Sequence, residues 1–584
     1  MSRSSIRSFI SIPISKSLSS LSAASRQTIV SGGVRGRTKG TRWPPNFGGA
    51  RSHSTTTPSN DHHGGRRLIT AFVGGTAITT ILVGSQLDST ASKNESSTPV
   101  SNVESSPPGT RRIRLSEVKQ HGADSPEPWV ARGTSVYDIT HWVSAHPGGE
   151  VILRAAGGSI DPYWKIFSIH NKQDVYDILE QFKIGEIDLL DLVDGRVPQE
   201  AIEDPFENDP LRDPRLRTLT AKPCNAETPS TGLAPFLTSN NFFYVRNHMW
   251  VPDVPESEHR LTIELPDGEE KCYTMEELKK RFHMHKITAT LQCSGNRRND
   301  MTVHARPTNG LQWTVGAISS AEWEGVMLRD VLVDAGLNTQ NLPDHAKHAQ
   351  FSGLEAYGAS IPISKAVDPS GDVLLAFKMN GEDLPRDHGY PLRVIVPGNV
   401  AARSVKWLRK VVISDEESTS QWQRRDYKCF GPNVQNPDWS KAKSIQEMPV
   451  TSAITDISNA SYFVHDKENT NAASPLTVSG YAYSGGGHEI VRVDISTDCG
   501  QTWDQAELLD DKTHGSKAWC WKRWRYSGAN LKGEGKTKLT LLVKATDESY
   551  NTQPKDHASI YNARGNLATA WHRVDIALRG GEAV

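Results

Sequence analysis

Residues 291–298 read LQCSGNRR, a single cysteine followed by a short polar loop and two adjacent arginines. A thiolate is a soft metal ligand, and neighbouring positive charge favours the thiolate form of a cysteine. Guanidinium groups bind oxyanions through paired hydrogen bonds. The stretch therefore predicts a metal ligand at Cys293 beside an oxyanion-binding site, although a cysteine that stands alone is more often a buried, inert thiol.

Together with several later segments, this stretch resembles the sulfite oxidase family, which also contains the eukaryotic nitrate reductases. The similar segments are FYVRNH at 243–248, Trp313 with GAIS at 316–319, HGYPLR at 388–393, RSVK at 403–406 and RRDYK at 424–428. The match spans roughly residues 110 to 580, so chance similarity explains it poorly.

The resemblance implies roles for individual residues. Cys293 is expected to be the sole protein ligand of molybdenum, with further sulfurs supplied by the pterin. Arg246, Arg298 and Arg564 are expected to surround the substrate oxyanion, and Trp313 and Tyr427 to form the pocket wall. The expected cofactor-binding residues are Tyr244, Val245, Arg246, Asn247, His248, Glu355, His388, Arg393, Ser404, Val405 and Lys406.

Without the resemblance, these residues have simpler explanations. His248 and His388 would be ordinary, partly buried histidines, and the polar residues from 393 to 406 would lie on a strand and a turn. Several positions depart from the family pattern: Glu355 replaces a usual aspartate, Cys429 replaces a usual glycine, and Lys522 and Arg523 lie in a segment that usually carries fewer charges. Glu355 keeps the carboxylate, and Cys429 is expected to be a tolerated small side chain.

Length and composition restrict the class of protein. A chain of 584 residues is too long for one core, so several domains are expected. A net charge of -1 argues against a nucleic-acid-binding protein. The six cysteines are scattered without a CxxC pair, which argues against a disulfide framework or a zinc cage.

The amino-terminal region has the composition of a targeting sequence. The first 60 residues contain no acidic side chain but nine Arg or Lys, which predicts a mitochondrial presequence over residues 1–66. A disordered basic tail is the alternative interpretation. Under either interpretation, these residues are not part of a folded domain.

An apolar run follows the presequence. Residues 68–84 are uncharged, and 17 residues is at the short edge for crossing a bilayer. A sorting segment at 67–85 that directs the protein to the mitochondrial intermembrane space and is then cleaved is the favoured interpretation. Permanent contact with the inner membrane is the alternative. Residues 86–110, rich in Ser, Thr and Pro, are predicted to be a flexible linker.

Two histidines predict a heme site. His146 begins the turn HPGG, His170 follows 24 residues later, and an apolar helix ended by glycines is predicted at 151–158. Two axial imidazoles on one iron porphyrin leave no open position, which makes an electron carrier. Residues 113–187 resemble cytochrome b5. We therefore predict a heme b domain at 111–190, held without thioether links.

An acidic segment separates this domain from the next. Residues 186–214 carry ten acidic and two basic side chains and four prolines, too little apolar surface to fold alone. Residues 191–214 are predicted to be a mobile tether. It either lets the heme move between electron donor and acceptor or is a spacer without that role.

The remaining chain is predicted to form two domains. Residues 215–442 are expected to be an α+β molybdenum–pterin domain with helices at 275–282 and 320–336. Residues 446–580 are expected to be an immunoglobulin-like β-sandwich, with strands at 476–483, 491–495 and 538–545 and a hairpin turn at 485–487. The resemblance makes this sandwich a dimerisation domain of a homodimer. Cys499 is predicted to be a packed thiol.

The resemblance implies an enzyme that oxidises sulfite to sulfate. Electrons would leave singly through heme b to cytochrome c, or to oxygen. A nitrate reductase is one alternative, but those enzymes usually carry the heme domain after the molybdenum domain. A heme-only electron carrier with an inactive molybdenum domain is another, and the presence of Cys293 with three candidate substrate arginines argues against it.

Overall fold

The computed structural model describes residues 111–143, 145–146, 149–167, 170, 173–198, 204–458, 476–509, 515, 517–528 and 538–577. The predicted presequence, apolar run and flexible linker lie outside the described residues, so these predictions stay untested. Within the described part of the chain, no helix is long and apolar enough to cross a membrane.

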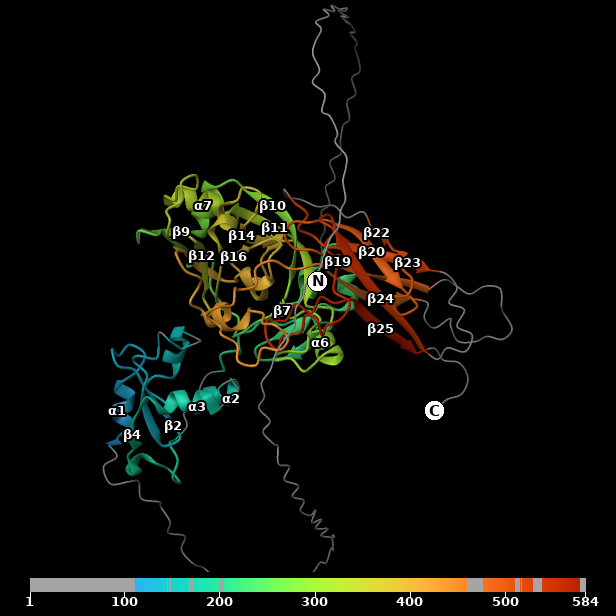
Figure 1. Ribbon diagram of the computed structural model, residues 1–584. Coiled ribbons are helices and arrows are strands. Elements are labelled where there is room, and N and C mark those ends of the chain that lie inside the picture. The colour runs from blue at the N-terminus through green and yellow to red at the C-terminus, as the bar shows by residue number, and fades with distance from the viewer. Residues whose placement is uncertain are drawn as a thin grey trace, which may run out of the picture. The chain divides into compact units, whose positions relative to one another are not determined.

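Residues 111–198 contain a four-stranded sheet with the strand order β1-β4-β3-β2 (Figure 1). Its strands are β1 (Arg112–Ile113), β2 (Trp129–Arg132), β3 (Ser135–Asp138) and β4 (Lys183–Ile187). The helices are α1 (Leu115–Gln120), the 3-10 helices η1 (Gly149–Ala155) and η3 (Leu189–Asp191), α2 (Asp161–Ile166) and α3 (Gln173–Glu180). The helix predicted at 151–158 is a 3-10 helix that ends at Ala155, because Gly157 turns the chain at a φ of 81°.

The next region contains two five-stranded sheets and one three-stranded sheet. In the first, β10 (His285–Gln292), β11 (Ile318–Met327), β14 (Leu374–Met379) and β15 (Glu382–Asp383) lie in that order, and β16 (Arg393–Ile395) pairs with β14. The second has the order β13 (Gly358–Pro362), β12 (His348–Gly353), β17 (Leu408–Ser414), β8 (Arg260–Glu264) and β9 (Glu270–Thr274). The third joins β5 (Arg217–Thr220), β6 (Asn225–Glu227) and β7 (Val245–Arg246).

Short helices connect these strands. They are α4 (Ser230–Leu233), η4 (Asn240–Phe242), α5 (Met275–Arg281), α6 (Arg298–His304), α7 (Leu328–Ala335), α8 (Ile363–Val367), η5 (Arg386–His388), η6 (Ala401–Arg403) and the π-helix η7 (Trp422–Asp426). Helix α5 confirms the helix predicted at 275–282. It starts at a capping box, in which the Thr274 side chain accepts from the Glu277 amide and the Glu277 side chain accepts in return.

The helix predicted at 320–336 is wrong over its first half. Residues Ile318–Met327 form β11, and only Leu328–Ala335 form helix α7. Strand β11 pairs with β10 on one side and β14 on the other. Because both of its faces are largely buried, its sequence lacks the alternation that identifies a half-buried strand.

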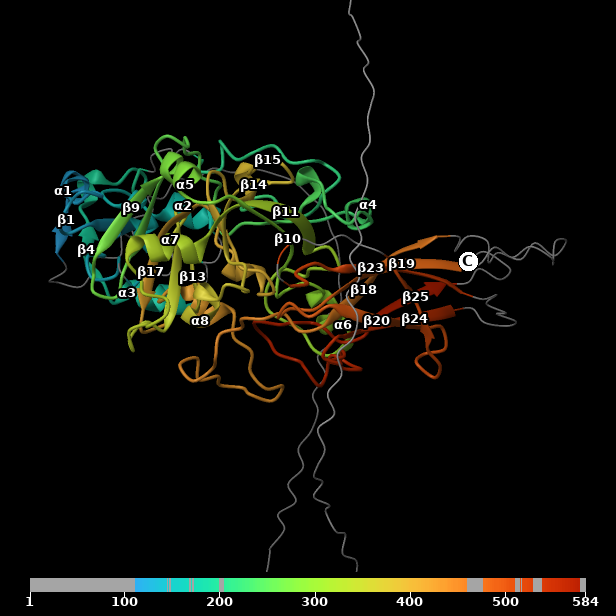
Figure 2. The same cartoon turned by 90° about the horizontal axis from the view of Figure 1, so that it is seen from above.

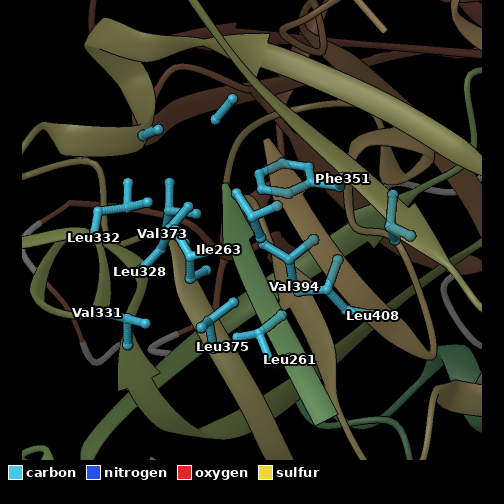
Figure 3. Packing of buried hydrophobic residues seen from close by; sticks show 14 of the residues in the cluster. Leu261, Ile263, Leu328, Val331, Leu332, Phe351, Val373, Leu375, Val394 and Leu408 are labelled. Atoms are coloured by element: carbon cyan, nitrogen blue, oxygen red, sulfur yellow. The ribbon is translucent and has the colours of Figure 1, made fainter. Parts of the chain in front are cut away.

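Two apolar cores lie on opposite faces of the β10-β11-β14 sheet. Leu375 belongs to one core, packed with Leu261 and Phe351 of the second sheet, and Figure 3 shows these side chains gathered together. Its neighbour Leu374 belongs to the other core, which also contains Cys293. Successive residues of a strand point to opposite faces, so this sheet separates the two cores.

The carboxy-terminal region is a sandwich of two four-stranded sheets, as predicted (Figures 1 and 2). One sheet has the order β18 (Thr451–Ser458), β19 (Leu476–Tyr483), β23 (Lys522–Gly528) and β22 (Glu507–Leu508). The other has the order β21 (Asp504–Gln505), β20 (Ile490–Ser496), β24 (Lys538–Asp547) and β25 (His572–Ala577).

Two details of this region differ from the predictions. The glycines at 485–487 do not form a hairpin turn, because β19 and β20 belong to different sheets and the segment carries the chain between them. Gly486 and Gly487 have φ values of 71° and 79°, which glycine adopts without strain. Cys499 is exposed and not packed, since it lies in a turn with a φ of 62°.

The end of the predicted tether is packed. Phe206 is buried, and the Asp209 carboxylate accepts a hydrogen bond of 2.8 Å from the Val251 amide. Arg212 binds both carboxylate oxygens of Asp387 at 2.8 and 2.9 Å. The segment from 204 onward is therefore fixed to the region that follows it. The beginning of the predicted tether is packed as well, since the Asp191 carboxylate binds Arg114 and Val197 is buried in the core of the preceding domain. The prediction of a mobile tether is therefore wrong at both ends, and its middle, residues 199–203, lies outside the described residues.

Candidate functional site

The loop after β10 places Cys293 in a tight turn. The Cys293 amide donates to the Ala317 carbonyl at 3.0 Å, and the Gly295 amide donates to Cys293 Sγ at 3.4 Å. Arg297 has a left-handed φ of 61° and directly precedes helix α6 as its N-cap. The turn therefore fixes the position of the Cys293 sulfur by backbone contacts on both sides of the residue.

Cys293 lines a cavity that also contains most of the predicted cofactor residues. The predicted residues in the lining are Tyr244, Arg246, His248, Cys293, Glu355, His388, Arg393, Ser404, Val405, Lys406 and Tyr427. They come from β7, the β12–β13 hairpin, η5, the start of β16, the segment before β17 and the end of η7. Residues far apart in the sequence therefore converge on one thiol.

Five predicted residues lie outside the lining: Val245, Asn247, Arg298, Trp313 and Arg564. Val245 packs with Leu216 in a small separate core, since it points away from its neighbours in β7. Trp313 is fully buried in the core that contains Cys293.

Several buried polar atoms of the cavity wall have no protein partner. They are His248 Nε2, Glu355 Oε2 and Arg393 Nε. Buried polar groups are normally hydrogen-bonded, so each such atom requires an explanation. Together they place an imidazole, a carboxyl group and a guanidinium group around one cavity. This set of donors and acceptors fits a polar heterocycle that carries a phosphate.

Burial controls the charge of these groups. Burial raises the pKa of Glu355, opposed by Lys406 and Arg246, and lowers the pKa of Lys406. Burial lowers the pKa of His388 to about 3 and holds the pKa of His248 well below its usual range, so both histidines are neutral at neutral pH.

Lys406 joins the cavity to the buried residues behind it. Its Nζ donates to the backbone carbonyls of Arg246 at 3.1 Å and Asp387 at 2.9 Å, and to the side-chain oxygen of Asn247. Asn247 Nδ2 donates to Asp387 Oδ1 at 2.9 Å, and Asp387 is also bound by Arg212. Asn247 therefore acts behind the cavity wall and not in it.

Arg298 lies next to the lining. Its Nη1 donates to the Leu311 carbonyl at 2.7 Å, and its Nε donates to the side-chain oxygen of Asn566. Burial lowers the pKa of Arg298, and Cys293 opposes this effect with its negative charge. The loop around Asn566 also reaches the loop that contains Cys293, because the Leu567 amide donates to the Ser294 carbonyl at 2.9 Å.

Arg564 is paired with a carboxylate. Its Nε donates to Asp426 Oδ1 at 3.0 Å, and its Nη2 contacts the same oxygen. Its side chain is 38% exposed. The structure therefore places Arg564 beside the cavity with much of its charge balanced, whereas Arg246 lies in the wall.

The two predicted heme ligands face each other. The rings of His146 and His170 are nearly parallel, with an interplanar angle of 8° and 6.3 Å between their centres. Two metal–nitrogen bonds of about 2 Å each, plus the distance from each nitrogen to its ring centre, account for this separation. His170 Nδ1 lies 3.0 Å from the Phe167 carbonyl, which leaves Nε2 for a metal. The pair fits a flat metal complex.

Neither site resembles a cage of protein ligands. Among the described residues, no group of three or more His, Cys, Asp or Glu side chains is arranged to hold a metal ion. One thiol and one pair of imidazoles therefore suit metals whose remaining ligands come from an organic group.

Comparison with known proteins agrees with this geometry. Residues 114–188 match the cytochrome b5-like heme/steroid binding domain, residues 248–422 the oxidoreductase molybdopterin binding domain, and residues 442–579 the Mo-co oxidoreductase dimerisation domain. Sulfite oxidase of Gallus gallus is 46% identical over 484 residues, which cover 80% of this chain and 100% of that protein. The chain belongs to the sulfite oxidase family.

Two further relatives extend the comparison. Mitochondrial sulfite oxidase of Rattus norvegicus is 43% identical to this family member over 471 residues, 79% of this chain and 83% of that protein. The crystal structure of the sulfane dehydrogenase SoxCD from Paracoccus pantotrophus covers 65% of this chain and 93% of its own, with a TM-score of 0.51 and 26% identity.

Several predictions are thereby confirmed. This sulfite oxidase family member is an oxidoreductase with a molybdopterin domain, a cytochrome b5 heme domain and a dimerisation domain, which supports a homodimer. The mitochondrial relative supports a mitochondrial location. The individual site residues and domain boundaries stay predictions.

Sequence reasoning missed two polar residues of the cavity wall, Tyr357 and Asp387. Each is close to a predicted residue, since Tyr357 follows Glu355 by two positions and Asp387 precedes His388. In the β12–β13 hairpin, alternate residues share a side, and this spacing was the available signal for Tyr357.

Proposed function

We propose that this enzyme oxidises sulfite to sulfate in the cavity beside Cys293 and passes two electrons, one at a time, through its heme module to cytochrome c. The observation that carries the proposal is the positive charge around the thiol. Arg246 lies in the cavity wall, and Arg298 is near enough for its charge to interact with those of Cys293 and Arg246. Such a field favours a dianion over a singly charged anion such as nitrate.

The cavity wall offers a cradle for the molybdenum cofactor. Cys293 would bind the metal, and the unpartnered atoms of His248, Glu355 and Arg393 would bind the pterin and its phosphate. Lys406 also lines this cradle, and its Nζ fixes the wall by donating to the backbone carbonyls of Arg246 and Asp387. Tyr244, His388, Ser404 and Val405 complete the proposed set.

The reaction adds one oxygen atom from water to sulfur, removes two electrons and releases two protons. When bound, the molybdenum–pterin group supplies the oxygen transfer and the two-electron change, and the heme supplies single-electron steps. The protein binds the anion, fixes its orientation and maintains positive charge where it reacts.

Each substrate-side residue has a distinct part in the proposal. Arg246 binds the anion directly, and Arg298 adds positive charge from behind the wall. Tyr427 lines the cavity and donates its hydroxyl proton to an anion oxygen. Trp313 keeps the wall rigid by its complete burial. Arg564, balanced by Asp426, contributes through its field.

The heme module receives the electrons. His146 and His170 would hold the heme between them, and the heme would supply single-electron transfer without binding a substrate. Cytochrome c is the proposed acceptor in the mitochondrial intermembrane space, because it accepts one electron at a time. The sandwich at residues 442–579 would join two copies of the chain.

Anaerobic addition of sulfite to the purified holoenzyme tests the proposal. We expect prompt reduction of the heme absorption bands, with nitrite and nitrate added separately as controls. A heme that dithionite reduces but sulfite leaves oxidised, in protein with full molybdenum content, would contradict the proposed substrate.

A further inference from the structure

A buried tyrosine of the carboxy-terminal sandwich contacts residues 293–298, called the metal-ligand loop because Cys293 is proposed to bind the metal. Tyr481 lies on β19, is fully buried and is not among the residues that line the cavity. Its hydroxyl accepts a hydrogen bond of 2.8 Å from Asn296 Nδ2 and donates to the Val315 carbonyl at 2.9 Å. One phenol therefore joins the segment after β10 to the segment before β11.

These two segments also bind each other at Cys293. The Cys293 amide donates to the Ala317 carbonyl at 3.0 Å, and the Ala317 amide donates in return to the side-chain oxygen of Asn296 at 3.0 Å. The Asn296 amide donates to the Cys293 carbonyl at 2.9 Å. Cys293, Ala317 and Asn296 therefore form a closed ring of hydrogen bonds, and Tyr481 binds this ring through Asn296 Nδ2.

The hydrogen bonds allow one orientation of the Asn296 side chain. Its oxygen accepts from the Ala317 amide, and its nitrogen donates to a hydroxyl whose own proton is given to the Val315 carbonyl. An amide rotated by 180° would place its nitrogen opposite the Ala317 amide, donor against donor. Asn296 is buried, so loss of the Tyr481 hydroxyl would leave its nitrogen without this partner, which is costly.

Tyr481 itself is fixed by the sandwich. Its ring stacks on Trp521 with 5.5 Å between centres and 24° between planes, and its carbonyl accepts from Trp524 Nε1 at 3.0 Å. The Trp521 amide donates to Thr290 Oγ1 of β10 at 2.9 Å. Burial raises the pKa of Tyr481, so its hydroxyl keeps its proton at neutral pH. The hydroxyl therefore stays in one place and in one protonation state.

We propose that Tyr481 is a positioning residue for Cys293: it holds Asn296 and Val315 so that the ring of hydrogen bonds fixes the thiol at the cavity. The inference rests on the proposed function, because it takes Cys293 as the ligand of molybdenum. Groups that hold a metal ligand from behind orient it and influence the metal. The sandwich thereby takes part in the metal site in addition to its role as dimerisation domain.

The Tyr481→Phe holoenzyme tests the proposal. The change removes one hydroxyl and keeps the ring that stacks on Trp521. We expect the kcat of sulfite oxidation to fall about two- to tenfold, the effect of one neutral hydrogen bond. The KM for sulfite should stay unchanged, because Arg246 and Tyr427, which are proposed to bind the anion, come from other segments. A raised KM with an unchanged kcat would overturn the positioning role.

The EPR spectrum of the molybdenum centre gives a readout that is independent of the substrate. The spectrum of the centre partly reduced with dithionite responds to the orientation of its sulfur ligands. We expect the g values of Tyr481→Phe to differ from those of the wild type at equal molybdenum content. Identical spectra would show that Tyr481 does not position the thiol.

Tyr483→Phe is the matched control. Tyr483 lies two residues further along β19, is also fully buried and packs in the same core as Tyr481. No hydrogen bond joins its hydroxyl to residues 293–317, all of which the structure describes. We expect the kcat and the EPR spectrum of this variant to equal those of the wild type. Equal changes in both variants would overturn the proposal, because loosening of the shared core would explain them.

The two proposals fail in different ways. If sulfite does not reduce the heme of the wild type, the proposed substrate is wrong, and a spectral difference confined to Tyr481→Phe would still support the positioning role. If sulfite reduces the heme but the spectra of Tyr481→Phe and the wild type are identical, the positioning role alone is contradicted.

Discussion

The heme site takes its two predicted ligands from short, half-buried segments, whereas the cavity beside Cys293 draws on strands, a hairpin and a π-helix far apart in the sequence. At the heme site, the His170 ring Nδ1 lies 3.0 Å from the Phe167 carbonyl. At the cavity, Lys406, Asn247, Asp387 and Arg212 form a connected network behind the wall.

The difference indicates what fixes the geometry of the heme site and what fixes that of the cavity. A pair of imidazoles is completed by the metal complex between them, so the heme itself supplies part of the order. The cavity wall is pre-organised by protein contacts, with only a few polar atoms left for the cofactor. We therefore expect substitutions at the heme site to cause loss of the heme without other structural change. Substitutions around the cavity are expected to disturb other residues of the network as well.

Cys293→Ser should have the largest effect. The hydroxyl is a poor replacement for a soft thiolate, so sulfite-driven heme reduction should fall by more than about 100-fold, beyond the loss usual for residues behind a metal ligand. Stopped-flow absorbance at the heme bands measures this rate. Dithionite should still reduce the heme fully, and loss of that reaction too would mean that the variant is misfolded.

His170→Ala should disconnect the two sites. The heme loses one axial ligand, so the heme content should fall severalfold while the molybdenum content stays unchanged. Sulfite oxidation with ferricyanide as acceptor should persist, but cytochrome c reduction should be abolished. Heme and molybdenum analysis checks both points, and full heme retention would contradict the assignment of His170.

Arg212→Ala should damage the molybdenum site from outside it. Asp387 would be left buried without its cation, and we expect a loss of about 2 kcal/mol, below the about 3–5 kcal/mol for a fully buried pair, because Arg212 is 18% exposed. Cofactor retention after dialysis and thermal unfolding measure the effect.

Arg215→Ala is the matched control for that prediction. Arg215 is three residues away and pairs with Asp213, but its side chain is 68% exposed. Exposed pairs contribute little, so this variant should retain the cofactor like the wild type. Equal damage in both variants would mean that the linker charge matters and not the contact with Asp387.

Glu355→Gln should give the smallest effect and depend on pH. Burial raises the pKa of Glu355 from 4.5 to about 7 in the cofactor-free protein, so the folded state binds more protons than the unfolded state between these values. Stability therefore falls as pH rises through this window. The melting temperature of the glutamine variant should therefore rise relative to that of the wild type as the pH increases from 4.5 to 7. Each kcal/mol of relative stability corresponds to about 2–4 °C. A difference in melting temperature between the two proteins that does not change with pH would contradict the ionisation of Glu355 in this range.

The heme site could be predicted from local sequence, since a HPGG turn and a second histidine lie close together in the chain. The strands at 476–483 and 538–545 were also predictable, because alternation marks half-buried strands. Strand β11 was not, because burial of both faces removes that alternation.

The cavity could be predicted only through the resemblance. Its residues span positions 243 to 427, and no short motif encodes contacts between separate sheets. Arg564 shows what a family resemblance does not predict, since its pairing with Asp426 depends on a contact between segments that are distant in the sequence. Tyr357 shows the same limit, because its ring stacks on His248, a residue distant from it in the sequence.

The contacts of the 562–567 loop with the metal-ligand loop have a consequence for protein synthesis. A ribosome releases the amino-terminal end first and adds about 5–20 residues per second. Arg298 and Ser294 are made first, whereas Asn566, the partner of Arg298, is translated 268 residues later, directly before Leu567. A chain that terminates early, after the molybdenum domain, would carry every proposed pterin ligand but lack the partners that hold the metal-ligand loop in place. Only copies translated past Leu567 would therefore assemble the complete site, so translation through this loop is a checkpoint for activity.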